Sequence, residues 1–208
     1  MFCGGVDEAG RGCLAGPVIA AVVVLPQNYE LPGFADSKSL SPEKRFQLEA
    51  EIRKQAAGFG IGLASARMID EINILQATIL AMARAVAQLP ILPENLLIDG
   101  NRTIPRKILE KFVKAPGSVS QKCIVRGDSL VPAISAASIL AKTFRDRMMM
   151  RLDASFPGYG FARHKGYGTR EHLEKIKLLG PSRLHRLTFA GVRPKGSENQ
   201  AHLWPGEK

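Results

Sequence analysis

The sequence predicts an α/β fold in which helices flank a mixed sheet. Short apolar runs, typical of strands, alternate along the chain with longer segments whose apolar residues recur at helical spacing. The predicted order is strand, strand, helix, strand, helix, strand, strand, helix, and such alternation favours a layered α/β architecture. The 208 residues are 45% hydrophobic but only 6% aromatic, so one mainly aliphatic core is expected.

The first two strands are predicted over residues 4–9 and 18–25. The second is rich in valine and continuously apolar, as in a strand that is buried on both faces. Glycine and proline are frequent in the connection, which lets the two strands pair as a hairpin; these residues are Gly10, Gly12, Gly16 and Pro17.

The middle of the chain predicts two helices around a third strand. Ser41 as N-cap and Pro42 at the first helical position mark the start of a helix that ends before Gly58. A strand over residues 60–66 then precedes a long helix over residues 69–89, whose apolar side chains recur on one face.

The second half of the chain predicts two further strands and two helices. The strands cover residues 96–98 and 122–126. A long helix begins at Ser129 or Ser135, and a last amphipathic helix covers residues 170–179.

The balance of charges indicates a polyanionic partner. The formal net charge is +10 and the isoelectric point is near 9.8. Such a balance favours nucleic acid as the partner, although lysines that only keep the protein in solution would give the same balance.

The cysteines and the N-terminus indicate a cytoplasmic protein with no membrane partner. Cys3, Cys13 and Cys123 are too widely spaced for a disulfide framework or a zinc site, and they fit buried thiols in a reducing cytosol. No basic region followed by an apolar run indicates a secretory signal. The longest apolar run, residues 18–25, is too short to span a bilayer.

The segment Asp7-Glu8-Ala9-Gly10-Arg11-Gly12 combines two kinds of binding capacity. Its adjacent carboxylates can help to hold a hard metal ion. Its two glycines let the backbone approach a ligand closely, and the arginine offers a charged fork for phosphate. A nuclease requires both capacities.

Three acidic sites each lie at the end of an apolar strand and beside or near a glycine. They are Asp7 with Glu8, Asp99 and Asp128. Ordinary turns also use Asp-Gly pairs, so one such site alone would mean little. Because α/β sheets gather ligands at strand ends, we expect the four carboxylates to converge on one edge of the sheet.

Converging carboxylates need a counter-charge, because their repulsion otherwise raises some of their pKa values. Mg²⁺ or Mn²⁺ supplies one, since hard cations prefer oxygen ligands. Two such ions about 4 Å apart suit in-line attack on a phosphodiester. Adjacent strand residues point to opposite faces, so either the strand twists at Glu8 or Glu8 binds by its carbonyl or from the rim.

The chain resembles the type 2 ribonucleases H of bacteria and archaea. The resemblance runs over nearly the whole chain and rests on ordered motifs: Asp7 to Gly12, Asp36 to Ser41, Asn73 to Ala77, Ile98-Asp99-Gly100, Gly127-Asp128-Ser129, Ala136 to Lys142, Arg145-Asp146 and His164 to Thr169. The related type 3 enzymes carry a glutamate in place of the last aspartate, and Asp128 favours type 2.

The resemblance implies a ribonuclease H-like fold with a mixed five-stranded sheet flanked by helices and a helical C-terminal extension. Residues 1–192 would form the catalytic domain and residues 193–208 a flexible tail. The implied activity is endonucleolytic cleavage of RNA in RNA–DNA hybrids and incision 5′ of single ribonucleotides embedded in duplex DNA. The products would carry a 3′-hydroxyl and a 5′-phosphate. The family's metal-binding and catalytic carboxylates fall on Asp7, Glu8, Asp99 and Asp128.

Recognition of the ribonucleotide is assigned by the resemblance to two segments. The backbone of Gly10, Arg11 and Gly12 would reach the ribose and its 2′-hydroxyl, and Tyr167 would form a platform under the following deoxyribose. Spacing alone would make Tyr167 a core or turn residue. Further candidate phosphate contacts are Ser37, Lys38, Lys142, His164 and Lys165.

Several roles stay open at the level of sequence. His164 lies in a basic loop, where exposure to solvent is expected, and Lys142 could instead pair with Asp146. Arg183, His185 and Arg186 could be solvated or touch DNA.

The tail and the general class of the protein also leave alternatives. Residues 200–204 resemble sliding-clamp-binding peptides, although Trp204 could pack back on the domain. No coiled-coil seam is evident, which favours a monomer. The alternatives to a ribonuclease H are another nuclease or resolvase on the same fold and a non-catalytic nucleic-acid-binding protein.

Overall fold

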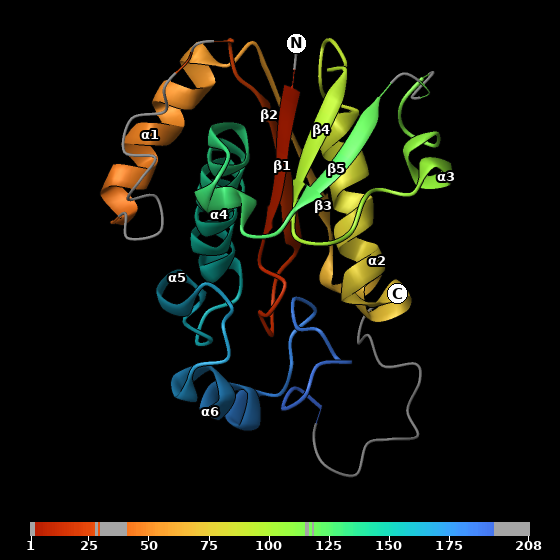
Figure 1. Ribbon diagram of the computed structural model, residues 1–208. Coiled ribbons are helices and arrows are strands. Elements are labelled where there is room, and N and C mark those ends of the chain that lie inside the picture. Colours follow the sequence, from red (N-terminus) through yellow and green to blue (C-terminus); the bar gives the residue numbers. More distant parts are fainter. Residues whose placement is uncertain (1–2, 28, 30–40, 115–116, 118, 194–208) are drawn as a thin grey trace.

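A five-stranded mixed sheet lies at the centre of the molecule, with strand order β3-β2-β1-β4-β5 (Figure 1). The computed structural model describes residues 3–27, 29, 41–114, 117 and 119–193. The strands are β1 (Cys3–Ala9), β2 (Val18–Val24), β3 (Gly58–Ala64), β4 (Asn95–Asp99) and β5 (Ser120–Ile124). β1, β2 and β3 pair antiparallel, whereas β1, β4 and β5 pair parallel, so the carboxyl ends of β1, β4 and β5 meet at one edge.

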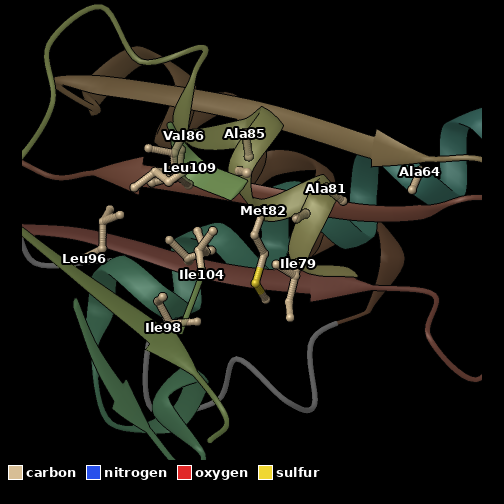
Figure 2. Packing of buried hydrophobic residues seen from close by; sticks show 14 of the residues in the cluster. Ala64, Ile79, Ala81, Met82, Ala85, Val86, Leu96, Ile98, Ile104 and Leu109 are labelled. Carbon is tan, nitrogen blue, oxygen red and sulfur yellow. The ribbon is translucent and has the colours of Figure 1, made fainter. Parts of the chain in front are cut away.

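Helices cover both faces of this sheet (Figure 1). One face packs against α2 (Ala66–Val86), and Figure 2 shows Met82 and Val86 of this helix with Leu96 and Ile98 of β4 in one buried cluster. The other face packs against α4 (Pro132–Ser155), beside which α1 (Pro42–Gln55) lies (Figure 1). The continuously apolar β2 is buried on both faces, as its sequence predicted.

Gly5 allows α4 to lie unusually close to β1. A Cβ at this position would fall 2.1 Å from the backbone carbon of Ala133 and 2.2 Å from the backbone nitrogen of Ile134. Any larger residue would therefore push the helix away from the strand. This close approach matters because β1 carries Asp7 and Glu8 two and three residues later.

The C-terminal part of the chain folds against the turn that joins β1 to β2 (Figure 1). It contains the short helix α5 (Phe161–His164), the amphipathic helix α6 (Arg170–Leu179) and a segment that continues to residue 193. Ala15 forms a β-bridge with His185, and the Arg186 N–H donates to the Leu14 carbonyl at 2.8 Å. This packing places the helical extension beside the carboxyl end of β1.

The predicted order of strands and long helices is confirmed, including the hairpin of β1 and β2 and the helix over residues 170–179. Several boundaries are shifted, since β3 covers residues 58–64 rather than 60–66 and α2 covers residues 66–86 rather than 69–89. Two further boundaries, near the acidic residues, are also wrong. The strand predicted to reach Arg126 ends at Ile124, because Arg126 is left-handed with φ 58°. The long helix starts at Pro132 rather than at Ser129 or Ser135, since Ser129 belongs to the 3₁₀ helix η3 (Gly127–Ser129).

Three further features were not predicted. No element was predicted where the short helix α3 (Arg106–Leu109) lies, and α5 lies where a basic loop was expected. The long helix α2 is kinked at Asn73, where φ is 64°. In the part of the chain that the structure describes, no helix combines the length and apolar character needed to cross a membrane.

Candidate active site

Asp7 and Asp99 follow the last paired residues of two neighbouring parallel strands. The parallel register of β1 and β4 aligns Val6 with Ile98, and each strand continues by one residue to its aspartate. Val6 and Ile98 face α2, so both aspartates face the α4 side. Two carboxylates from segments 92 residues apart are therefore brought together at one sheet edge.

The surroundings of Asp7 raise its pKa. Its side chain is 6% exposed. Burial, followed by repulsion from Glu8 and a smaller repulsion from Asp99, raises the pKa of Asp7 to about 7. The Glu8 N–H donates to Asp7 Oδ1 at 2.7 Å and only partly offsets this rise. The Ser138 hydroxyl on α4 also lies beside the carboxyl, without a well-aligned hydrogen bond.

Glu8 leaves the strand on the opposite face. The pairing of β1 with β2 continues through Glu8 and Ala20 to Ala9 and Ile19, so the twist considered at Glu8 is absent. Burial raises the pKa of Glu8, and Asp99 adds to the rise, while Arg11 at 3.2 Å lowers it. Of the arrangements considered from the sequence, approach from the rim or through the carbonyl is compatible with this regular strand.

Asp128 is linked to Asp99 through the backbone. The N–H of Gly127 donates to Asp99 Oδ1 at 2.6 Å, and Asp128 follows directly in η3. The left-handed Arg126 turns the chain out of β5 so that this short helix can begin beside β4. Three of the acidic positions thus lie at the carboxyl ends of adjacent parallel strands, as expected.

The donor set suits a divalent cation. All four side chains offer carboxylate oxygens, which Mg²⁺ and Mn²⁺ prefer. Burial and the repulsion from Glu8 raise the pKa of Asp7, so a nearby cation would favour its charged form. Among the described residues, however, no three Asp, Glu, His or Cys side chains already stand in the arrangement of a closed metal site. Holding a cation would therefore require the carboxylates to reorient or other ligands to join them.

The turn after β1 is held from inside by two buried arginines. Arg186 donates to the carbonyls of Gly10 at 2.6 Å, Arg11 at 2.7 Å and Gly16 at 3.0 Å. Arg145 donates to the Ala15 carbonyl at 3.1 Å. Burial lowers the pKa of Arg186 to about 10, which still leaves it charged at neutral pH.

Gly10 is required by this packing. Its φ is +91°, and a Cβ there would lie 2.1 Å from Arg145 Nε. Gly12 differs, since a Cβ there would meet nothing within 4 Å. Gly12 and Arg11 are exposed, so this part of the turn is open to a ligand.

Tyr167 lies beside the same turn. The Leu14 N–H donates to the Gly166 carbonyl at 2.8 Å, and Arg145 Nη1 donates to the Lys165 carbonyl at 2.8 Å. The Tyr167 ring is 51% exposed, with the Arg145 guanidinium 5.8 Å from its centre. The two segments that the family resemblance assigned to sugar recognition are thus adjacent, and Tyr167 is not a core residue.

The other candidate contacts have mixed outcomes. His164 was expected in an exposed loop, but it is buried in α5 because its ring bonds to the Tyr159 carbonyl and stacks on His172. Lys165 Nζ donates to the Ala162 carbonyl. Lys142 is exposed and Asp146 instead lies 3.9 Å from Arg45. Ser37, Lys38 and the tail from residue 194 lie outside the described residues.

His185 and Arg186 were missed as structural residues. The sequence left them either solvated or in contact with DNA, but both are fully buried. Their partners lie in the turn after β1 and in α6, so no local pattern could indicate these contacts. Arg145 was noted only as part of a motif, without a role.

Comparisons with known proteins agree with this geometry. A family model described as Ribonuclease HII matches residues 4–192. A Ribonuclease HII of Nitratidesulfovibrio vulgaris is 56% identical over 201 residues, covering 96% of this chain and 91% of that protein. Many further relatives carry the same name, including one from Porphyromonas gingivalis that is 52% identical over 188 residues.

Two solved structures are similar in fold. The ribonuclease H2 of Pyrococcus horikoshii OT3 has a TM-score of 0.75 and 27% identity, covering 93% of this chain and 96% of that one. The RNase HII of Archaeoglobus fulgidus, solved in a complex with PCNA, has a TM-score of 0.74 and 28% identity, covering 94% of this chain and 98% of that one.

Proposed function

Because the chain belongs to the ribonuclease HII family, whose members are metal-dependent endoribonucleases that act on RNA–DNA hybrids, we propose that it also incises duplex DNA at single embedded ribonucleotides. The cut falls on the 5′ side of the ribonucleotide and leaves a 3′-hydroxyl and a 5′-phosphate. The observation that carries this proposal is the adjacency of the carboxylate edge to the turn of residues 10–12 and to Tyr167.

Asp7, Glu8, Asp99 and Asp128 are the proposed metal ligands, and Mg²⁺ or Mn²⁺ is the proposed ion. Two divalent ions at such a site supply activation of the attacking water and stabilisation of the leaving oxygen. The protein supplies the carboxylates and holds Asp99 in place through the Gly127 N–H. The buried position of Asp7 keeps bulk water from screening its charge.

Recognition of the sugar is proposed to involve the exposed backbone of Arg11 and Gly12 together with Gly10. With their carbonyls bound inward by Arg186, Gly10 and Arg11 are fixed in place before the substrate arrives. Backbone groups without a side chain can approach a 2′-hydroxyl closely. The exposed face of Tyr167 then packs against the next sugar, where an extra hydroxyl would fit less well.

Basic and polar side chains are proposed to bind phosphates. Lys142 and Lys165 belong to this set, and Ser37 and Lys38 are assigned to it from the sequence alone. The net charge of +10 supports binding to a nucleic-acid backbone that weakens as salt rises. His164 is not proposed to contact a phosphate, because it is buried.

A sliding clamp is proposed as a partner of the C-terminal tail. The support is the glutamine and aromatic pattern of residues 200–204 and the complex with PCNA of the similar Archaeoglobus fulgidus protein. Co-elution of the full chain with a bacterial sliding clamp in gel filtration tests this, and Trp204→Ala should abolish it. Co-elution that survives this change would place the contact elsewhere.

The proposed reaction is tested with an end-labelled duplex that carries one ribonucleotide. Wild-type protein with Mg²⁺ or Mn²⁺ should cut 5′ of that ribonucleotide, whereas chelator should abolish cutting. Asp7→Asn and Asp128→Asn should each lower the rate by on the order of 100-fold or more. Equal cutting of an all-DNA duplex of the same sequence would refute the specificity.

A further inference from the structure

Three of the four histidines pack together behind the loop that carries Tyr167. The rings of His164 and His172 stack with centroids 4.2 Å apart, and those of His172 and His185 lie 5.2 Å apart. All three side chains are buried, and two aromatic rings surround them, those of Tyr159 and Phe161. The ribonuclease chemistry proposed above uses none of these imidazoles.

The donor and the acceptor of each hydrogen bond in this cluster can be assigned in only one way. The Ser182 backbone N–H lies 2.9 Å from His185 Nδ1, and a backbone amide can only donate, so Nδ1 accepts. A neutral His185 ring therefore carries its proton on Nε2. That nitrogen lies 3.0 Å from His172 Nε2, which must accept, so the His172 proton is on Nδ1. His172 Nδ1 lies 2.8 Å from the Tyr167 carbonyl and donates to it.

We propose that His172 is a positioning residue for sugar recognition: His185 fixes its tautomer, and its Nδ1–H holds the Tyr167 carbonyl so that the ring faces the substrate. This inference rests on the proposed role of Tyr167. The same carbonyl also accepts the Thr169 N–H at 2.8 Å, and Thr169 caps α6. The chain of bonds thus joins Ser182, two imidazoles and the start of α6 to one point of the loop.

The cluster is not arranged to bind a metal ion. His185 Nδ1 and His172 Nε2 already accept hydrogen bonds. His164 Nδ1 accepts the Gly166 N–H at 3.2 Å, so its Nε2 donates to the Tyr159 carbonyl at 2.8 Å. Each imidazole therefore uses its one lone pair within the protein, and none is left for a cation.

Neutral rings are required by this arrangement. A second proton on His172 would place two donors 3.0 Å apart at the contact with His185, and a second proton on His185 would face the Ser182 N–H 2.9 Å away. Burial lowers the pKa of both rings, to about 4 for His185, and the nearby His164 lowers both further. The negative charge of Glu171 raises the pKa of His172 and partly offsets this lowering. His172 and His185 are consequently neutral at physiological pH.

Two substitutions at one position separate the positioning role from simple packing. In His172→Asn, the amide nitrogen of the new side chain is separated from the backbone by the same number of bonds as Nδ1 of histidine. It can therefore still donate to the Tyr167 carbonyl. In His172→Gln, the amide nitrogen lies one bond further out, at the position of Nε2, and the Tyr167 carbonyl loses this donor. Both variants remove the imidazole, so a merely structural role would affect them alike.

The decisive kinetic quantity is kcat/KM at a single embedded ribonucleotide divided by kcat/KM on a continuous RNA–DNA hybrid. We expect His172→Gln to lower this ratio about tenfold, while His172→Asn keeps it within about threefold of wild type. Equal ratios in the two variants would overturn the inference. A wild-type protein that does not cut at a single ribonucleotide would instead refute the proposed function.

Nitrogen-15 spectra of the histidine rings test the inference without reference to activity. The wild-type full chain at neutral pH should show an Nδ1–H tautomer for His172 and Nε2–H tautomers for His164 and His185. The Tyr167 and Thr169 amide signals should shift in His172→Gln and stay close to wild type in His172→Asn. Mixed tautomers in wild type, or unshifted amides in His172→Gln, would contradict the proposal even if a variant folds poorly.

Discussion

The Gly10 carbonyl accepts a 2.6 Å hydrogen bond from Arg186 Nη2, although 176 residues separate the two in the chain. Gly10 belongs to the turn that follows the strand with Asp7 and Glu8, and Arg186 belongs to the C-terminal segment. The same guanidinium reaches the carbonyls of Arg11 and Gly16. The C-terminal extension therefore fixes the shape of the proposed ribose reader, which no residue within the turn could do alone.

Arg186→Lys should destabilise the protein by about 2–4 kcal/mol. The lysine keeps the charge, but its donors all lie on one nitrogen and cannot replace the separate Nη1 and Nη2 groups that reach the three carbonyls, so buried acceptors lose their partners. Urea unfolding monitored by circular dichroism measures the loss. Arg183→Lys is the matched control, because Arg183 is exposed and should change stability by less than about 0.5 kcal/mol. Equal effects of the two changes would mean that the carbonyl contacts do not contribute.

Gly10→Ala and Gly12→Ala should separate folding from substrate contact. Gly10→Ala combines a left-handed backbone with a collision at Arg145, so we expect a loss of about 2–4 kcal/mol in unfolding free energy. Gly12→Ala meets no atom within 4 Å and should fold with wild-type stability. If the Gly12 backbone approaches the sugar, its alanine variant should nevertheless incise a single ribonucleotide about tenfold more slowly. Unchanged incision would remove Gly12 from the reader.

Tyr167→Ala should lower discrimination more than stability. The ring is half exposed, so its removal should cost no more than about 1 kcal/mol of folding free energy. The preference for a deoxyribose after the ribonucleotide should fall, as measured by comparing duplexes with one and with two consecutive ribonucleotides. Tyr167→Phe keeps the ring and should retain the preference. If Tyr167→Ala also retained it, another residue would have to read that sugar.

Stability should fall in acid because of the buried histidines. The pKa values of His172 and His185 are lowered in the folded protein, the latter from 6.5 to about 4, so the unfolded chain binds protons that the native state does not. Their contribution is fully present above pH 6.5 and is lost as pH falls toward 4. The free energy of unfolding of wild type should drop by on the order of 2 kcal/mol more than that of His185→Asn between pH 7 and pH 5. This comparison cancels titrating groups that do not contact His185, including Asp7, whose raised pKa acts in the opposite direction. The difference also includes any change at the neighbouring His172. Equal drops would show that His185 is not buried as a neutral ring.

Local patterns were sufficient to predict most of the sheet and the long helices. Valine-rich β2 and the Ser41-Pro42 start of α1 are examples in which burial or capping is encoded in consecutive residues. Asp7 and Asp99 could be placed at one edge because parallel strands end there together. The positive φ of Arg126 and Asn73 could not be predicted, because few residues other than glycine adopt it. At Asn73 the side chain accepts the Gln76 N–H at 3.1 Å and so caps the helix after the kink.

The buried side chains that hold the turn after β1 and the Tyr167 loop in place could not be predicted from the sequence. Arg145, His185 and Arg186 are charged or titratable residues of kinds that usually lie at the surface, yet all are buried. Arg145 and Arg186 donate hydrogen bonds to backbone carbonyls of the distant turn after β1. Every residue has a backbone carbonyl, so such contacts cannot be predicted from the types of residues in the turn. The same reasoning explains why His164 was placed in solvent.

Anomalous scattering from Mn²⁺ in crystals of the protein bound to a duplex with one ribonucleotide tests the central claim most directly. The account predicts two manganese peaks about 4 Å apart, held by Asp7, Glu8, Asp99 and Asp128 and next to the phosphate 5′ of the ribonucleotide. Peaks located away from these carboxylates, or a ribonucleotide bound away from Gly12 and Tyr167, would contradict it.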